Sequence, residues 1–511
     1  MIYMFYMVKA MFCNRFKRKD RKMTTSKTMV LALATLGALA ATADFDLKVK
    51  LWRGESLSVI VPDECPDIGA SAPGIVVEKG TLLPVRYLDG AKMASLEYKT
   101  VADRAVYGSK TPGIHFATIT AAAEAKPGTY TLGQLEVTVV DHVLPPAKDW
   151  KYFLDLWQHP WAVARTSGTV PFSAAHYRAM EPLWKMLAAA GQKTLTVTLV
   201  DRPWNHQCYD AYGTMIGRRK GADGKWSFDY SVFDQYVTFG RACGLGPDIA
   251  CYTMCPWGYM VDYTDADGKA VRVEAKPGTP VFDDYWGDFL VDFSKHLESK
   301  GWLKDTYIAM DERTPEDLAY IAKFVRRVAP GLKIAMAGNR KPSDFNGIVI
   351  DNYSQSMGHV NQPFLDEVPA RRKEGKTTTY YICCGPARPN TLMSSTPGEA
   401  FVCGFYPAAC GLDGLLRWAY NSWGEDACND MTYMRWKAGD VALVYPDGSP
   451  SWRFLELKNG IQAAEKFRIL KEAGGRDKEL AALAAKFDLQ TLLKGTDYMK
   501  LRAAVQATVN R

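Results

Sequence analysis

The sequence has 511 residues, of which 47% are hydrophobic and 23% charged, and it is long enough for two or three domains with large cores. Its formal net charge is +7, and the first 43 residues, with eight Lys or Arg and one Asp, account for all of it. The remainder is close to neutral and has no basic stripe, so nucleic-acid binding is excluded as the leading function.

The first predicted element is a secretory leader over residues 1–43. A group of Lys and Arg residues precedes the apolar run MVLALATLGALAATA, which ends at Ala43. A basic region, a short apolar region and small final residues define a signal peptide, so we expect cleavage near Ala43 and export to the periplasm or beyond. The run is too short to cross a bilayer, and no later segment approaches 18 apolar residues, so no membrane span is predicted.

Residues 44–145 are predicted to form an antiparallel β-sandwich. Short runs that alternate apolar and polar residues, such as LSVIVPDE and TYTLGQLEVTVVDH, are separated by Gly, Pro and Asp. The segment VLPPAKDW then reads as a linker.

From residue 150 to 450 strand-like runs alternate with amphipathic helical segments, including residues 173–191 and 315–331. The second of these helices has Thr314 as its N-cap and Pro315 at its first position. Eight strands with intervening helices predict a (β/α)8 barrel, and residues 451–511 are predicted to be a helical extension packed on it. The expected strands are 152–157, 194–200, 249–254, 306–310, 333–338, 347–353, 377–383 and 411–420.

Ten cysteines follow the leader, and in a mature chain this long they are not needed as staples. Buried thiols are the default expectation, with one or two disulfides possible. Cys251 and Cys255 have no matching His or Cys pair elsewhere, so a zinc site is not expected. The ten are Cys65, Cys208, Cys243, Cys251, Cys255, Cys383, Cys384, Cys403, Cys410 and Cys428.

Two neighbouring carboxylates, Asp311 and Glu312, directly follow the fourth predicted strand. Acids favour helix starts, so the plain interpretation is a capping acid beside a solvated one. The carboxyl ends of barrel strands, however, carry the active site of this architecture. The pair is therefore equally a candidate for catalysis.

Aromatic, amide and acidic residues follow several other predicted strands. Aromatic rings cover the apolar faces of a pyranose and amides bind its hydroxyl groups, so this combination predicts a sugar site, although each residue alone could equally belong to the core. His159 lacks the spacing of a metal ligand, DADGKA at 265–270 reads as a turn, and no nucleotide or phosphate motif is present, so no cofactor or metal is expected. The predicted substrate-binding residues are His159, Trp161, Asn205, Trp257, Tyr353, Trp418, Tyr420, Asn421 and Trp423.

The adjacency of the two acids also bears on mechanism. Most glycosidases place two carboxyl groups about 5 to 10 Å apart across the scissile bond. Adjacent strand-end residues point in different directions and do not easily straddle a bond. They fit substrate-assisted hydrolysis better, in which the 2-acetamido oxygen of the sugar is the nucleophile and both carboxylates act on one region of one sugar.

Three segments together resemble glycoside hydrolase family 123, the retaining β-N-acetylgalactosaminidases with a β-sandwich ahead of a (β/α)8 barrel. They are YIAMDE at 307–312, GLDGLLRWAYNSW at 411–423 and VYPDGSPSWRFLELKNGI at 444–461, within a similarity that spans about 150–470. The chain departs from the family's pattern where Asn459-Gly460 precedes IQAAEKF in place of an acidic helix.

The resemblance implies that Glu312 is the general acid/base and that Asp311 polarises the 2-acetamido group, with an oxazolinium intermediate and retained anomeric configuration. Tyr353 is predicted to donate to the acetamido oxygen, and Trp418 and Trp423 to form the pocket wall.

The expected partner is therefore a glycan with terminal β-linked N-acetylgalactosamine, cleaved in an exo manner. Two alternatives stay open. One is another β-hexosaminidase or an endo-acting glycosidase, which the residues alone do not distinguish from the first. The other is a carbohydrate-binding surface protein without catalysis, for which an intact acid pair would have no purpose.

Overall fold

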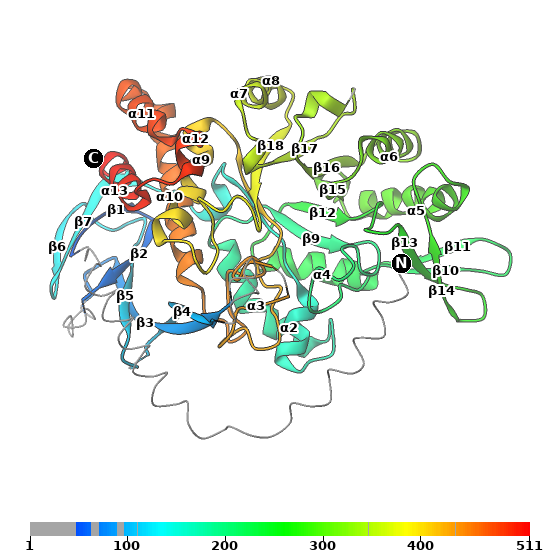
Figure 1. The fold of residues 1–511 in the computed structure, drawn as a ribbon, viewed down its shortest axis with the longest axis horizontal. Helices are drawn as coiled ribbons and strands as arrows, with labels where there is room; N and C mark the ends of the chain where they lie inside the picture. Colours follow the sequence, from blue (N-terminus) through cyan, green and yellow to red (C-terminus); the bar gives the residue numbers. More distant parts are fainter. Residues whose placement is uncertain (1–46, 63–70, 89–96, 110, 346, 435) are drawn as a thin grey trace. The chain divides into compact units, whose positions relative to one another are not determined.

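Eight parallel strands form a nearly closed barrel, as the sequence predicts, with hydrogen-bonded neighbours in the order β8-β19-β18-β17-β16-β15-β12-β9 (Figure 1). Strands 153–156, 194–198, 248–252, 306–310 and 333–338 closely match the predicted runs. The eight are β8 (Phe153–Leu156), β9 (Thr194–Thr198), β12 (Asp248–Tyr252), β15 (Thr306–Met310), β16 (Lys333–Gly338), β17 (Asn352–Ser356), β18 (Thr377–Ile382) and β19 (Gly414–Arg417).

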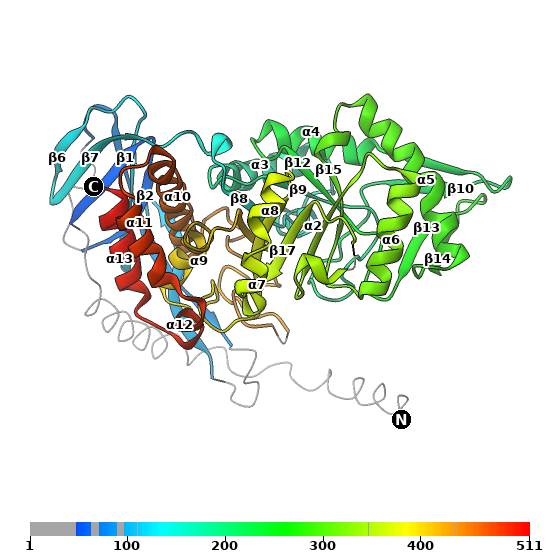
Figure 2. The ribbon, with the colours of Figure 1, turned by 90° about the horizontal axis from the view of Figure 1, so that it is seen from above.

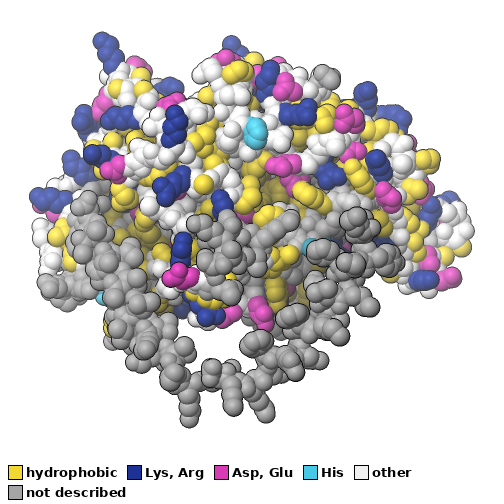
Figure 3. All heavy atoms as spheres, viewed as in Figure 1, with side chains coloured by type: hydrophobic (Ala, Val, Ile, Leu, Met, Phe, Trp, Pro, Cys, Tyr) yellow, Lys and Arg dark blue, Asp and Glu magenta, His cyan; other side chains and the backbone are white. Residues whose placement is uncertain are grey.

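The structure is a computed structural model that describes residues 47–62, 71–88, 97–109, 111–345, 347–434 and 436–511. These residues all belong to one compact unit, Phe45–Arg511, and the predicted leader lies outside them. Across this described part of the chain, no helix combines the length and the apolar character that crossing a bilayer requires. Acidic and basic side chains are interspersed on the face seen in Figure 3.

Helices connect the barrel strands, and they begin where the sequence provides caps. Thr314 accepts a hydrogen bond from the Asp317 amide at 3.2 Å and starts α6, as predicted, while Ser173 starts α3 in the same way. The helices of the barrel are α2 (Pro160–Ser167), α3 (Ala174–Ala188), α4 (Ser231–Ala242), α5 (Pro280–Ser299), α6 (Pro315–Val328), α7 (Gln362–Leu365), α8 (Val368–Lys373) and α9 (Pro397–Cys410).

Two glutamines bridge the seam between β8 and β9, where only a single isolated backbone bridge, Leu154 to Gln192, pairs the strands. Gln192 accepts from the Leu156 amide at 2.9 Å, and Gln158 accepts from the Thr196 amide at 2.9 Å. Both side chains are buried, so they satisfy backbone groups that a regular ladder would otherwise pair. The barrel is therefore closed at this seam largely by side-chain amides.

The sixth strand begins five residues later than predicted, at Asn352 rather than Gly347. Asp351 accepts hydrogen bonds from the Ile334 amide at 2.8 Å and from Arg326 at 3.1 Å, which fixes it just before the strand. Asp351, Asn352 and Tyr353 therefore lie at the amino end of β17. The predicted strand 347–353 would place Tyr353 at the carboxyl face of the barrel, and that prediction is wrong.

A small sheet that the sequence did not predict follows β9 and β12. Two hairpins, β10 (Gly217–Lys220) with β11 (Trp226–Asp229) and β13 (Met260–Thr264) with β14 (Ala270–Glu274), pair in the order β11-β10-β13-β14. This sheet lies beside α5 (Figure 2), where the guanidinium of Arg218 stacks on aromatic rings of that helix. The segment at 265–269 is the turn of the second hairpin, as expected.

Two N-terminal sheets pack face to face through a shared apolar core, in the sandwich that the sequence predicts. The four-stranded sheet, ordered β2-β5-β3-β4, is antiparallel, whereas the sheet ordered β1-β7-β6 contains one parallel pair, β1 with β7. The strands are β1 (Lys48–Arg53), β2 (Ser56–Val61), β3 (Ile75–Tyr87), β4 (Lys99–Tyr107), β5 (Ile114–Ala121), β6 (Gly128–Leu132) and β7 (Leu135–Val143).

The C-terminal helices begin with α10 (Trp452–Ala473), which contacts α9 on one side and strands β2 and β4 on the other (Figures 1 and 2). Its buried charges meet buried partners in the sandwich: Lys466 lies 2.7 Å from Glu55, and Arg453 lies 3.0 Å from Asp103. The remaining helices are α11 (Asp477–Ala484), α12 (Leu489–Lys494) and α13 (Tyr498–Val509). The extension thus binds the sandwich as well as the barrel.

Helices α9 and α10 cross at two glycines, Gly404 and Gly460. A Cβ at Gly460 would overlap the Phe401 carbonyl oxygen, and one at Gly404 would lie 2.5 Å from the Leu457 carbonyl oxygen. Because these are backbone atoms, the helices would have to separate. Asn459, the neighbour of Gly460, accepts from the Ser58 amide and donates to its carbonyl. The departure from the family's pattern at Asn459-Gly460 therefore has a packing role in this chain.

Gly460→Ala is expected to lower the free energy of unfolding by about 3 kcal/mol, near the upper end for overpacking a core. Gly287→Ala in α5 is the matched control, because a Cβ there meets nothing within 4 Å. That change should raise the free energy of unfolding by about 0.5–1 kcal/mol. Urea denaturation of both variants measures the two effects, and equal stability of Gly460→Ala and the unchanged protein would contradict the close crossing.

Candidate active site

Asp311 and Glu312 stand at the carboxyl end of β15, the fourth strand of the barrel in chain order. The N-cap of the following helix is Thr314, so capping does not account for the two carboxylates. Asp311 is half-buried and Glu312 is exposed.

Asp311 is held by two donors. The indole Nε1 of Trp257 donates to its Oδ2 at 3.1 Å, and the backbone amide of Glu312 donates to its Oδ1 at 2.8 Å. Burial raises the pKa of Asp311 above its ordinary value, and the neighbouring charge of Glu312 acts in the same direction. The two donors act against that rise and favour the carboxylate form.

Glu312 is held by a different group, the hydroxyl of Tyr381, which donates to its Oε1. Tyr381 lies on the inner face of β18, three strands away from β15 in the sheet. The hydrogen bond leaves Oε2 of Glu312 free of any protein hydrogen bond among the described residues. The two adjacent carboxylates thus have separate supports and different exposures.

Trp257 and Asn205, both predicted as substrate-binding residues, are brought to Asp311. Asn205 donates from Nδ2 to the Trp257 carbonyl at 2.7 Å, and the Trp257 amide donates to the Pro203 carbonyl at 2.9 Å. Asn205 has a φ of +52°, a left-handed conformation that Asn tolerates better than most residues. The loops after β9 and β12 therefore fix the indole that holds Asp311, and the ring keeps an exposed surface.

Arg313 adds a positive charge next to the acid pair. Its guanidinium lies over the rings of Trp257 and Tyr259, at 5.8 and 5.2 Å from their centroids. The Tyr259 hydroxyl in turn donates to Asp317 at 3.0 Å. This group links the loop after β12 to the start of α6, so the position of Arg313 is fixed by aromatic contacts.

Aromatic rings fill the end of the barrel beneath this face. Trp157 stacks on Trp204 with centroids 5.1 Å apart and meets Tyr252 at 4.4 Å, while Trp161 and Trp418 pack against the same cluster. Trp418 also contacts Trp436, with centroids 6.2 Å apart. Trp161 and Trp418 are half-buried and remain candidates for the wall of a sugar site.

The other predicted residues have internal partners. His159 and Asn421 bind each other through backbone and side-chain atoms at 2.8 and 3.0 Å, and burial lowers the pKa of His159 to about 3, so its ring is neutral. Tyr420 donates to the Leu183 carbonyl at 3.0 Å, and Trp423 donates to the Val444 carbonyl at 2.6 Å. All four are fully buried and stabilise the scaffold around the site.

Tyr353 is not brought to the acid pair as a free hydroxyl. It is fully buried, its ring lies between Phe345 and Phe364, and its hydroxyl donates to the Arg340 carbonyl. Tyr381 is the hydroxyl that reaches the pair, and sequence reasoning missed it. The signal was the Tyr380-Tyr381 pair in the seventh strand, in which consecutive side chains point to opposite faces.

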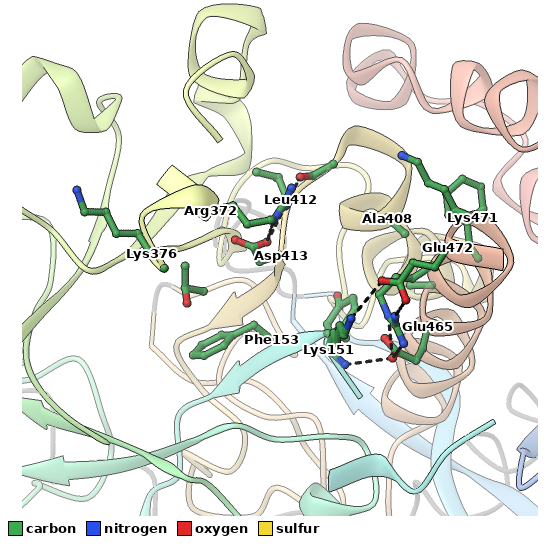
Figure 4. A pocket seen from close by; sticks show the side chains of 17 residues that line it. Lys151, Phe153, Arg372, Lys376, Ala408, Leu412, Asp413, Glu465, Lys471 and Glu472 are labelled. Carbon is green, nitrogen blue, oxygen red and sulfur yellow. Dashed lines mark hydrogen bonds and ion pairs between the residues drawn. The ribbon is translucent and has the colours of Figure 1, made fainter. Parts of the chain in front are cut away.

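A cavity of about 540 Å³ lies at the opposite end of the barrel (Figure 4). Its lining includes Phe153 and Thr377, the first residues of β8 and β18. Its charged side chains pair with one another, as in Arg372 with Asp413 at 2.6 Å and Lys151 with Glu472 at 3.3 Å. The cavity is therefore separate from the acid pair.

Among the residues that the structure describes, no group of three or more His, Cys, Asp or Glu is arranged to hold a metal.

A family model and a solved structure each match more than half of the chain. Residues 157–470 match the family model described as glycoside hydrolase 123, catalytic domain. A solved family 123 glycoside hydrolase from Clostridium perfringens, described for its hydrolysis of glycolipid glycans, is similar with a TM-score of 0.77 and 24% identity, over 91% of this chain and 93% of that one.

Two xylanases are much less similar. A family 10 xylanase with a bacterial Ig-like domain, from termite gut, has a TM-score of 0.35 and 11% identity over 82% of this chain and 99% of its own. The family 10 xylanase of Thermobacillus composti has a TM-score of 0.32 and 9% identity over 59% of this chain and 100% of its own. No curated protein sequence is significantly similar to this one.

The matched family domain covers more than half of the sequence, which confirms the resemblance of the three short segments. The chain therefore belongs to glycoside hydrolase family 123.

Proposed function

We propose that this glycoside hydrolase is an exo-acting β-N-acetylgalactosaminidase that retains anomeric configuration by substrate-assisted hydrolysis. The observation that carries the proposal is the pair of adjacent carboxylates with separate supports, Asp311 on the Trp257 indole and Glu312 on the Tyr381 hydroxyl. Two groups so close together fit action on one sugar better than on opposite sides of a bond.

In the proposed mechanism Glu312 protonates the glycosidic oxygen as the bond to the leaving group breaks. The acetamido oxygen of the substrate attacks the anomeric carbon, and Asp311 accepts the acetamido N–H and stabilises the positive charge of the oxazolinium ion. Glu312 then removes a proton from the water that opens this intermediate. The indole donor keeps Asp311 oriented throughout, so little reorganisation is needed as charge develops.

Glycolipid or glycoprotein glycans are the proposed partners. The similar enzyme from Clostridium perfringens is described for glycolipid glycan hydrolysis, which supports trying glycolipid oligosaccharides first.

We also propose that the protein is exported, because the leader over residues 1–43 has the composition of a signal peptide. Mass measurement of protein recovered outside the cytoplasm would detect cleavage near Ala43.

The substrate class is tested with nitrophenyl glycosides of β-GalNAc, β-GlcNAc and β-galactose. Hydrolysis of the β-GalNAc compound, with retained configuration seen by NMR, is the expected result, and the galactoside should be inert because it lacks the acetamido nucleophile. Hydrolysis of the galactoside at a comparable rate would refute the substrate-assisted mechanism. Preference for β-GlcNAc would favour another β-hexosaminidase.

If the protein only binds carbohydrate, it should bind one of these glycosides without hydrolysing it. If all three compounds are inert, a glycolipid oligosaccharide should be offered, and release of its terminal sugar would rescue the proposal. Release of an internal oligosaccharide would point to an endo-acting enzyme instead.

Tyr381→Phe is expected to lower kcat about tenfold, because Glu312 loses its only described hydroxyl donor and is no longer fixed in one orientation. Tyr380→Phe is the matched control. Its hydroxyl donates to the Cys403 carbonyl at 2.6 Å, on the outer face of the same strand, so its removal should lower stability but not kcat. Equal losses of kcat in both variants would indicate a general defect of β18 rather than a role for Tyr381.

A further inference from the structure

Two adjacent cysteines, Cys383 and Cys384, directly follow β18. Their sulfur atoms lie 3.9 Å apart, and both side chains are half-buried. The described cysteines are all free thiols, and most of them are buried. This pair differs from the rest because its two thiols face each other and remain partly accessible.

The pair belongs to the rim of the active site. Cys383 follows Tyr381 by two residues and packs against the same inner cluster of the barrel, which includes Leu416 and Trp418. Tyr381 in turn holds Glu312. Cys383 therefore packs against the cluster that contains the residue that orients Glu312.

The backbone around the pair is fixed by buried contacts. Asn390, fully buried, donates from Nδ2 to the Cys383 carbonyl at 2.9 Å and to the Pro386 carbonyl at 2.6 Å. The Cys383 amide donates to the Gly385 carbonyl at 3.1 Å. The loop is therefore held in one conformation that keeps the two thiols together.

The two thiols have different acidities. The contact with Cys383 lowers the pKa of the Cys384 thiol to about 7, although burial and the nearby charge of Asp440 both act to raise it, and the same contact raises the pKa of Cys383. A thiol whose pKa is near ambient pH is the most effective attacking group in thiol–disulfide exchange. Cys384 is thus the nucleophile of the pair.

We propose that Cys383 and Cys384 form a reversible dithiol–disulfide couple at the rim of the active site, which a low-molecular-weight disulfide oxidises. The Cys384 thiolate attacks one sulfur of the external disulfide, forms a mixed disulfide and releases the first thiolate. Cys383 then gives up its proton and attacks the Cys384 sulfur, which releases the second thiol. The two cysteines lose two electrons and two protons, and the external disulfide becomes two thiols.

The resulting disulfide is easily reduced. Neighbouring Cα atoms are about 3.8 Å apart, below the usual separation of about 4.4–6.8 Å in disulfides, so the bond is strained. Strained, accessible disulfides are the labile and regulatory ones. Its formation draws the two sulfurs together by nearly half of their present separation and displaces Cys383 beside Tyr381.

Oxidised glutathione applied to the full protein, followed by alkylation and peptide mass analysis, tests the couple. The expected peptide with both cysteines is two hydrogen atoms lighter and unalkylated, and dithiothreitol reverses the change. Cys383→Ser should retain glutathione on Cys384, because the resolving thiol is missing. Alkylation of both thiols after the treatment, or a disulfide from either to another cysteine, would overturn the proposal.

The effect on the active site is measured separately, as kcat/KM of the oxidised and re-reduced protein on the best substrate. Oxidation is expected to lower kcat/KM at least about threefold, since Tyr381 is displaced from Glu312. Cys410→Ser and Cys428→Ser, which remove half-buried single thiols, should respond as the unchanged protein does. A complete disulfide with unchanged kcat/KM would refute the link to the site. This readout rests on the proposed function, whereas the mass result does not, so the two can fail independently.

Discussion

Glu312→Gln is expected to lower kcat/KM on β-GalNAc substrates with poor leaving groups by about 10²–10⁴, the usual contribution of a general acid. Glutamine can still accept the Tyr381 hydrogen bond, so the geometry of the site is retained. What is lost is the proton that the leaving oxygen needs. Nitrophenyl glycosides need protonation of the leaving oxygen least, so their kcat/KM should fall less than that of natural glycans. Measuring kcat/KM over a series of leaving groups tests this difference directly.

Glu316→Gln is the matched control for this substitution. Glu316 is exposed in the first turn of α6, four residues from Glu312. Its replacement by glutamine removes one negative charge, as Glu312→Gln does. Its kcat/KM should equal that of the unchanged protein. A loss in Glu312→Gln that is uniform across all leaving groups would instead remove Glu312 from the role of acid.

Asp311→Asn is expected to lower kcat by about 10²–10³ on every leaving group, because the positive charge of the oxazolinium intermediate loses its carboxylate. Asparagine can accept only one of the two hydrogen bonds that hold the carboxylate, and with its amide oxygen toward the Trp257 indole the side chain should remain in place. Asp288→Asn, exposed on α5, is the control of equal chemistry. A loss confined to poor leaving groups would mean that the roles of Asp311 and Glu312 are reversed.

The ionisation of Asp311 is also expected to set the acidic limb of the profile of activity against pH. Its carboxylate is the active form, and burial raises its pKa above the ordinary value. Activity should therefore be present above this raised pKa and be lost as the pH falls through it. Asp311→Asn should show the residual rate without that limb. An unchanged acidic limb in the variant would assign it to another group.

Much of the barrel could be predicted because its strands are short buried runs and its helices carry caps, as at Thr314. The sixth strand was misplaced because the apolar run before Asp351 resembles a strand, and only the contacts of Asp351 with Ile334 and Arg326 show where the chain enters the sheet. The strands of the hairpins beyond β9 and β12 are only four or five residues long and rich in polar residues, so an alternation this brief does not distinguish them from loops. They are stabilised by packing on α5, which sequence periodicity does not report.

The acid pair could be predicted because it follows a strand, but the residues around it depended on side-chain direction. Shifting a strand by one residue exchanges its inner and outer faces. Tyr353 and Tyr381 illustrate this: both are tyrosines in barrel strands, yet only Tyr381 points inward to Glu312. Tyr420 and Trp423 follow the last strand as active-site residues often do, but the chain turns back there and buries both.

The buried charges of α10 bear on how the protein can be divided. Replacing the sandwich with one that lacks Glu55 and Asp103 would leave Lys466 and Arg453 buried without their counter-charges, and an uncompensated buried charge costs about 3–5 kcal/mol. The sandwich is consequently not an interchangeable module like many appended sugar-binding domains. A chimaera that exchanges it between relatives would have to exchange the facing positions of α10 as well, so the two parts are expected to be inherited together.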